Sequence, residues 1–461
     1  MKLEKTNPRR EFIKNSVLTA AGLTILPAFG FGATGNFTAI NKEAFEFATV
    51  LDGEKTVAFI CHAYYRRSHA DVIGTKLYVG LPMDDGMKTM RLKVVSMHIE
   101  QINDEDIGVQ IAKMNGTAMY PTIWDALTLG GDKLAVDAVI YVGEHGDFPI
   151  NRLGQKMYPR MNTLETIFRV LDASNKTVPV FSDKALSYSW LDAKWIYDRA
   201  KELNVPMMSG SSLPYAHRST GLVHPVGVKI KEAVAVGYGT LDGYGHHVTE
   251  ILQCMVERRA GGETGVASVQ ALQGDEVWAA LDSGKISWEL TNAACDTITY
   301  RAQGSVRDLV KKPYAVIVKY NDGTKGALLM LTGTTLKTRT DGLPPRSGSF
   351  AYAANANGKT VATEFVIDIG LRSTHFAYYI ANIEQMIVTG EPQAPLERNL
   401  LTTGIIDMGI RSLNEGKIKE TPFLNIKYSA KGYNTIRPTN AMATNVVPWP
   451  PKGYEFLGWK K

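Results

Sequence analysis

Residues 56–71, TVAFICHAYYRRSHAD, constrain the fold of this chain more than any other stretch. The apolar run at 57–60 is β-rich and long enough for a fully buried strand. A sharp turn follows, and then a helical pattern in which Ala70, Ile73 and Leu77 share one face. A strand, turn and helix in this order opens an α/β domain. Nucleotide phosphates bind at such a turn, because backbone N–H groups and the helix N-terminus point at the ligand.

The turn itself departs from a dinucleotide site. Such a site normally has G-x-G-x-x-G, and the three glycine positions here hold Cys61, Ala63 and Arg66. One interpretation is that Arg66 and Arg67 contact a phosphate or carboxylate directly by bidentate hydrogen bonds. The other is that the turn is rebuilt, lies in solvent and binds nothing. The sequence leaves both open.

Strand and helix patterns alternate after this unit. Apolar runs at 92–97, 135–142, 178–181 and 206–209 predict strands, with helical patterns between them. Such alternation predicts a doubly wound, mostly parallel sheet with right-handed crossovers. We therefore expect a Rossmann-like α/β domain over residues 50–220.

The pattern changes near Val223, where strand-like segments begin to follow one another without helices between them. This succession predicts an α+β domain with an open, mostly antiparallel sheet over residues 221–425. Helical patterns return at 374–388 and 396–413. Residues 426–461 predict an extended C-terminal tail.

Composition excludes several classes of protein. A length of 461 residues is long for one core and suggests two domains. The net charge is +5, but the first 33 residues carry five Lys/Arg against two Glu, a net +3, which leaves +2 for the rest. That charge is too small to suggest nucleic acid. Three cysteines cannot form a disulfide framework, and beyond the N-terminus no apolar run approaches the roughly 18 residues of a membrane span.

The N-terminus predicts export. Arg9 and Arg10 are followed by Phe12, Ile13 and Lys14, and then by a small, apolar stretch to residue 33. This pattern matches a twin-arginine signal peptide at residues 1–33, which would place the processed protein in the periplasm or outside the cell. The alternative is a basic amphipathic helix or a membrane anchor.

The predicted two-domain order and four local motifs resemble the Gfo/Idh/MocA family of sugar and inositol oxidoreductases. The motifs lie at 60–70 (I-G-x-G-x-x-G-x-x-H-A in the family), 137–140 (D-x-V-x-I), 181–185 (E-K-P) and 245–250 (G-x-H-x-x-D). The chain also resembles an exported subgroup with a degenerate dinucleotide fingerprint, through blocks such as GSSLP and QCMVERRAGGETGV. Two further departures are Gly243, where the family has an acid, and the lack of an acid at residues 97–99, where one would bind the adenosine ribose.

The resemblance implies a site. Its catalytic candidates are His247, Lys184 and Asp183, its substrate-binding candidates are His145, Asp147, Glu250 and Arg218, and its cofactor-binding candidates are Cys61, Ala63, Arg66 and Arg67. A histidine suits proton transfer with a sugar hydroxyl near neutral pH, and a lysine at a strand end can hold a hydroxyl. The alternatives are a surface lysine and a structural histidine. No metal is expected, because no H-x-x-x-H or cysteine spacing supports one.

The function that follows is an exported oxidoreductase acting on a carbohydrate or sugar derivative, with NAD(P) as a doubtful cofactor because the fingerprint glycines are missing. A non-redox lyase, hydrolase or epimerase is the competing enzyme class. A carbohydrate-binding protein with an inactive catalytic frame is the third alternative. The expected partners are a small carbohydrate and a second copy of the chain paired through the open sheet.

Overall fold

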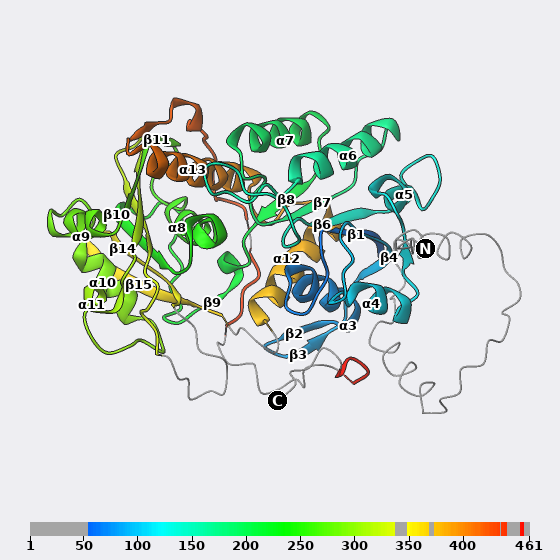
Figure 1. Ribbon diagram of the computed structural model, residues 1–461, viewed down its shortest axis with the longest axis horizontal. Coiled ribbons are helices and arrows are strands. Elements are labelled where there is room, and N and C mark those ends of the chain that lie inside the picture. The colour runs from blue at the N-terminus through cyan, green and yellow to red at the C-terminus, as the bar shows by residue number, and fades with distance from the viewer. Residues whose placement is uncertain (1–53, 337–347, 368–372, 434, 440–451, 456–461) are drawn as a thin grey trace, which may run out of the picture.

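A computed structural model describes residues 54–336, 348–367, 373–433, 435–439 and 452–455. The predicted signal peptide at 1–33 and most of the predicted tail lie outside these residues. Two sheets form the body of the molecule, and helices pack around and between them (Figure 1). None of the helices in these ranges combines the length and the apolar character needed to cross a membrane.

The first sheet is six-stranded and entirely parallel, in the order β5-β4-β1-β6-β7-β8. Its strands are β1 (Lys55–Cys61), β4 (Leu92–Ile99), β5 (Ala118–Met119), β6 (Ala138–Val142), β7 (Val180–Asp183) and β8 (Met207–Gly210). Counted along the chain, this is the 3-2-1-4-5-6 order of a Rossmann fold, with its switch point between β1 and β6. The predicted doubly wound sheet is confirmed.

Both faces of this sheet are buried, which explains why its strands are continuous apolar runs. Helices α5 (Ile123–Thr128), α6 (Arg160–Ala173) and α7 (Trp190–Glu202) cover one face. Helices α4 (Gly108–Met114) and α12 (Thr374–Thr389) cover the other. Thr122 caps the N-terminus of α5, since its hydroxyl accepts the Asp125 N–H.

The first crossover differs from the regular helix expected after the turn. A π-helical segment, η1 (Asp71–Thr75), leads into a single α-helical turn, α3 (Lys76–Val79). A hairpin of β2 (Leu81–Met83) and β3 (Gly86–Lys88) then precedes β4. The hydrophobic face of Ala70, Ile73 and Leu77 is buried as predicted. The periodicity of the sequence therefore predicts which side chains are buried, but it does not predict that the first turn is π-helical.

The second sheet is eight-stranded, in the order β16-β11-β12-β13-β10-β14-β15-β9. Its strands are β9 (His217–Arg218), β10 (Ile230–Gly237), β11 (Val266–Gln273), β12 (Tyr314–Tyr320), β13 (Lys325–Met330), β14 (Phe350–Ala356), β15 (Lys359–Val366) and β16 (Lys419–Glu420). Among these described strands, β10 and β13 form the one parallel pair. The predicted mostly antiparallel sheet is confirmed.

Helices cover both faces of this second sheet. On the side toward the first domain lie α8 (His246–Val256) and α13 (Leu396–Glu415). On the outer side, α9 (Asp275–Asp282) and α10 (Trp288–Asp296) pack on β10, β13 and β14, with α11 (Val306–Leu309) beside them (Figure 1). The part of the open sheet under these helices is therefore not a bare surface for pairing.

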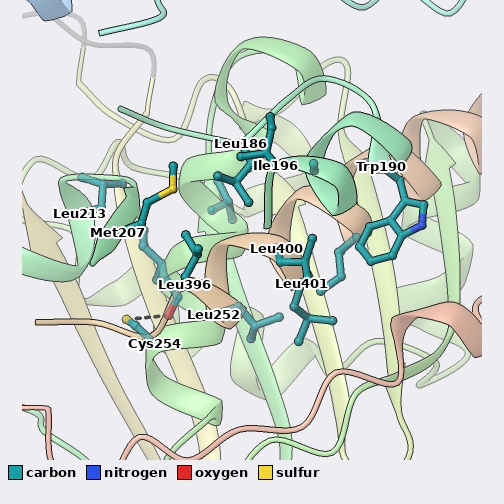
Figure 2. Packing of buried hydrophobic residues seen from close by; sticks show 14 of the residues in the cluster. Leu186, Trp190, Ile196, Met207, Leu213, Leu252, Cys254, Leu396, Leu400 and Leu401 are labelled. Atoms are coloured by element: carbon teal, nitrogen blue, oxygen red, sulfur yellow. Dashed lines mark hydrogen bonds between the residues drawn. The ribbon is translucent and has the colours of Figure 1, made fainter. Parts of the chain in front are cut away.

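A single hydrophobic core joins the two domains. It contains Leu186 and Ile196 from the first domain, Leu252 from α8, and Leu400 and Leu401 from α13. Figure 2 shows α13 packed between these elements. Every residue of α8 is buried, so the side chains at its first turn are held against the carboxyl ends of the parallel strands. The contact between the first turn of α8 and the carboxyl ends of the parallel strands is called the seam here, and polar side chains of both domains meet at it.

Candidate active site

The centre of the candidate site is an ion-pair cluster at the carboxyl ends of β6 and β7. The Lys184 ammonium lies 2.9 Å from Glu144, and Arg160 pairs with the other oxygen of the same carboxylate. Burial alone would raise the pKa of Glu144, but the two cations outweigh it and hold the pKa well below its usual range. Glu144 therefore stays ionised and fixes the Lys184 ammonium at the edge of the sheet, where open α/β folds bind ligands.

The backbone of this edge is strained at the same place. Lys184 and His145 have positive φ angles of 62° and 65°, which residues with side chains rarely adopt. Several bonds hold Lys184 in this conformation: its N–H donates to the Gly210 carbonyl, and its own carbonyl accepts from Ser209 and Asn399. Strain of this kind persists only where the surroundings impose it, and it is frequent at functional sites.

The α8 side of the site contributes His247. Its Nδ1 lies 2.6 Å from the Ser211 hydroxyl, which already accepts the Leu213 N–H at 3.1 Å. A serine hydroxyl can donate to Nδ1 or accept from it, and donation to Nδ1 places the proton of the neutral imidazole on Nε2. Burial and the nearby Lys184 cation lower the pKa of His247 well below its usual value. His247 is thus a neutral imidazole, which can donate a hydrogen bond from one ring nitrogen and accept one at the other.

A second histidine faces it from the turn after β1. His69 Nδ1 lies 2.5 Å from the Asp183 carboxylate. A carboxylate only accepts hydrogen bonds, so Nδ1 carries the proton and Nε2 of the neutral ring has a free lone pair. The His69 ring centroid lies 6.2 Å from that of His247 and 5.5 Å from that of His145.

His145 completes this wall of the site. Burial and the neighbouring His69 lower the pKa of His145 to about 3. Within the described chain its buried Nε2 has no hydrogen-bond partner. A buried polar atom without a partner has a free-energy cost that a ligand could remove. The structure therefore brings together Asp183, Lys184, His145 and His247 of the predicted residues.

Other predicted residues lie apart from this cluster. Glu250 is buried behind it, where its carboxylate accepts from the Thr402 hydroxyl. Arg218 is buried on β9, with its guanidinium over the Phe365 ring and bonded to the Leu222 carbonyl. Asp147 is exposed and bonded to Gln101 through its backbone. These positions make Glu250 and Arg218 structural supports of the seam.

The turn after β1, where a dinucleotide site would have its glycines, has buried and exposed parts. Cys61 and Ala63 are buried, whereas Arg66 and Arg67 are exposed. The Cys61 carbonyl accepts from the Glu100 N–H. This bond continues the pairing of β1 with β4 up to the start of the turn.

The segment that follows β4 crosses the switch point. The Gln101 N–H donates to the His62 carbonyl, and the Gln101 side chain bonds both the N–H and the carbonyl of Asp147, beyond β6, at 2.7 and 3.0 Å. A dinucleotide pyrophosphate crosses the end of the first strand between these loops. The Gln101–Asp147 bridge thus joins the loops on either side of the switch point, and the turn after β1 lacks the glycines that let a pyrophosphate approach closely.

Sequence reasoning missed several members of the cluster. Glu144 and Arg160 were not site candidates, although Glu144 follows a predicted strand directly, which is a usable signal. His69 stood in a family motif without a role, and Asp183 is 114 residues away from it in the chain. Ser211 lies in the GSSLP block, to which the resemblance assigned no role. Among the described residues, no group of three or more His, Cys, Asp or Glu side chains is arranged to hold a metal ion.

The arrangement defines a class of fold: a Rossmann domain joined to an open-sheet α+β domain, with polar residues of both at the seam. This is the two-domain fold of the Gfo/Idh/MocA-type sugar and inositol dehydrogenases, as the motifs predicted. GenD2 from gentamicin A biosynthesis, solved in complex with NAD, is 13% identical with a TM-score of 0.50 over 80% of this chain and 96% of its own. The apo scyllo-inositol dehydrogenase from Lactobacillus casei is 10% identical with a TM-score of 0.50 over 80% and 98%. No family model and no curated protein matches the chain.

Proposed function

We propose that this chain is an exported, oxidoreductase-like enzyme that carries out acid–base chemistry on a carbohydrate or sugar derivative. The observation that supports it is the convergence of Lys184 and His247, 63 positions apart in the sequence, on one seam where dehydrogenases of this fold have their active site. Lys184 would hold a substrate hydroxyl by its ammonium. His247 would donate its Nε2 proton to a substrate oxygen.

The reaction class has two candidates. Oxidoreduction is favoured by the fold, since GenD2 and the inositol dehydrogenase share it. A non-redox lyase, hydrolase or epimerase is favoured by the Gln101–Asp147 bridge, because proton transfer needs no dinucleotide. In either reaction class, Lys184 would bind a hydroxyl and His247 would donate a proton without the help of a nucleotide.

Screening purified protein against neutral and oxidised sugars, with and without each nicotinamide dinucleotide, tests this proposal. His247→Ala and Lys184→Met should each lower turnover by about two to four orders of magnitude. The comparison variant is His246→Ala: His246 is buried one position earlier on α8, and its Nε2 lies 3.5 Å from Asn399, where the charges of Lys184, Arg160 and Glu144 also act on it. Equal losses for His246→Ala and His247→Ala would argue for a structural role of both histidines.

Export is part of the same proposal and rests on Arg9 and Arg10, outside the described residues. Replacing both with lysine should leave the precursor in the cytoplasm, since the transport receptor reads the arginine pair. Normal amounts of the double-lysine protein outside the cytoplasm would remove the twin-arginine interpretation.

A further inference from the structure

We infer that His69 is a second catalytic residue of this site and acts as a general base, with Asp183 as the residue that positions it. The inference rests on the proposed function and adds a role that the sequence motifs did not assign. It depends on the geometry of four side chains: His69, Asp183, His247 and Ser211.

The first argument is the contrast between the two histidines. His69 has a carboxylate at 2.5 Å from Nδ1, whereas His247 has a serine hydroxyl at 2.6 Å from its Nδ1. A carboxylate stabilises the imidazolium that forms when His69 takes a proton, and a neutral hydroxyl gives His247 no such support. The base of the pair is therefore His69, and His247 is the neutral donor.

The second argument is placement. The His69 side chain is 15% exposed and that of Asp183 is 1% exposed, so the imidazole reaches solvent while the carboxylate behind it is shielded. Phe376 lies edge-on to the His69 ring at 5.2 Å and limits its rotation. His69 lies two residues before the π-helical segment η1, and His247 lies two residues after another, η3 (Leu241–Gly245). Such segments are frequent at functional sites.

In the proton transfer that this inference implies, residues of this chain accept the proton and stabilise both charges that form. The O–H bond of a substrate hydroxyl breaks and leaves its electron pair on the oxygen, while an N–H bond forms at His69 Nε2. The Lys184 ammonium stabilises the oxyanion, and Asp183 stabilises the imidazolium. No group is oxidised or reduced in this step, so it serves either reaction class.

Kinetics of His69→Gln and Asp183→Asn test the inference on whichever sugar the screen identifies. Both variants should lower kcat by about two to four orders of magnitude with little change in KM. Asp183→Asn should also shift the acidic limb of the pH profile to lower pH, because the His69 imidazolium loses the carboxylate that stabilises it, and a merely structural role would not do this. His98→Ala is the matched control, because His98 is buried at the end of β4 and bonded to the Tyr120 carbonyl outside the site.

A measurement without substrate separates the inference from the proposed function. Long-range ¹H–¹⁵N spectra of histidine-labelled protein should show the Nδ1–H form for His69 and the Nε2–H form for His247, and Asp183→Asn should change the His69 signal. Nε2–H at His69, or full activity of His69→Gln beside an inactive His247→Ala, would overturn the inference and leave the proposed function standing. Wild-type protein that turns over no sugar would overturn the function, and the catalytic role of His69 with it.

Discussion

At the scale of single residues, the seam contains a carboxyl group with an unusual protonation state. Burial raises the pKa of Glu250 from 4.5 to about 7, although the Arg398 cation and the Thr402 hydroxyl oppose the shift. The folded protein therefore binds a proton at Glu250 that the unfolded chain releases above about pH 4.5. Between about pH 4.5 and 7 the contribution of this group to stability must fall as the pH rises.

This pKa predicts a measurable pH dependence of unfolding. The contribution of Glu250 to the free energy of unfolding should fall by about 3 kcal/mol from pH 4.5 to pH 7 and then level off. Glu250→Gln removes the titration, so its free energy of unfolding should fall less over this range than that of the wild type. Chemical denaturation at four pH values between 5 and 8 measures both slopes. Equal slopes would show that Glu250 is ionised in the folded protein throughout.

At the scale of elements, α13 connects the core to the site. Its Asn399 donates to the Lys184 carbonyl and accepts from the Leu186 N–H, so the position of this helix sets the loop that holds Lys184. Two glycines on the helix differ in their surroundings. A Cβ at Gly404 would lie 2.5 Å from Leu424 and 2.9 Å from the Trp190 ring, whereas one at Gly409 would lie 3.3 Å from Val316.

Substitution of these two glycines should therefore have opposite effects. Gly404→Ala should destabilise the protein by roughly 1–2 kcal/mol, because overpacking against an indole exceeds the gain in helix propensity. Gly409→Ala gains the same propensity with a contact that a few tenths of an ångström relieve, so its stability should be unchanged or higher by up to about 1 kcal/mol. Thermal and urea unfolding compare the two. A Gly404→Ala protein as stable as the wild type would show that α13 can shift freely.

The sequence predicts the elements of this fold better than the contacts between them. Strands β1, β6 and β7 are buried on both faces, so each is a continuous apolar run that can be recognised from neighbouring residues in the sequence. The meeting of Lys184 with a strand-end cluster also follows from parallel strands ending at one edge. The His69–Asp183 contact and the Gln101–Asp147 bridge join side chains far apart in the chain, and periodicity has no information about them. The helices α9 to α11 were not predicted either, because the strand pattern around them masked their shorter helical signals.

At the scale of the whole molecule, two polar arrangements lie at the carboxyl edge of the parallel sheet. One is the cluster in which Glu144 and Arg160 fix Lys184 beside α8. The switch point of the Rossmann sheet, in contrast, is crossed by the Gln101–Asp147 bridge. The polar cluster around Lys184 and the bridge at the switch point are thus separate features of this molecule.

This separation leads to a prediction about cofactor binding. Purified protein titrated with the four nicotinamide dinucleotides should show no binding tighter than about millimolar, because pyrophosphate cannot approach the β1 turn closely past the bridge and the added side chains. Gln101→Ala removes both bonds across the switch point and should increase whatever weak affinity exists. Asn103→Ala, on the same segment, is the control and should change nothing, because the Asn103 side chain accepts from the Glu105 N–H of its own loop. Calorimetry or nicotinamide fluorescence measures all three proteins. Micromolar binding by the wild type would show that the bridge opens in solution, and it would make nicotinamide-dependent oxidoreduction the reaction of this site.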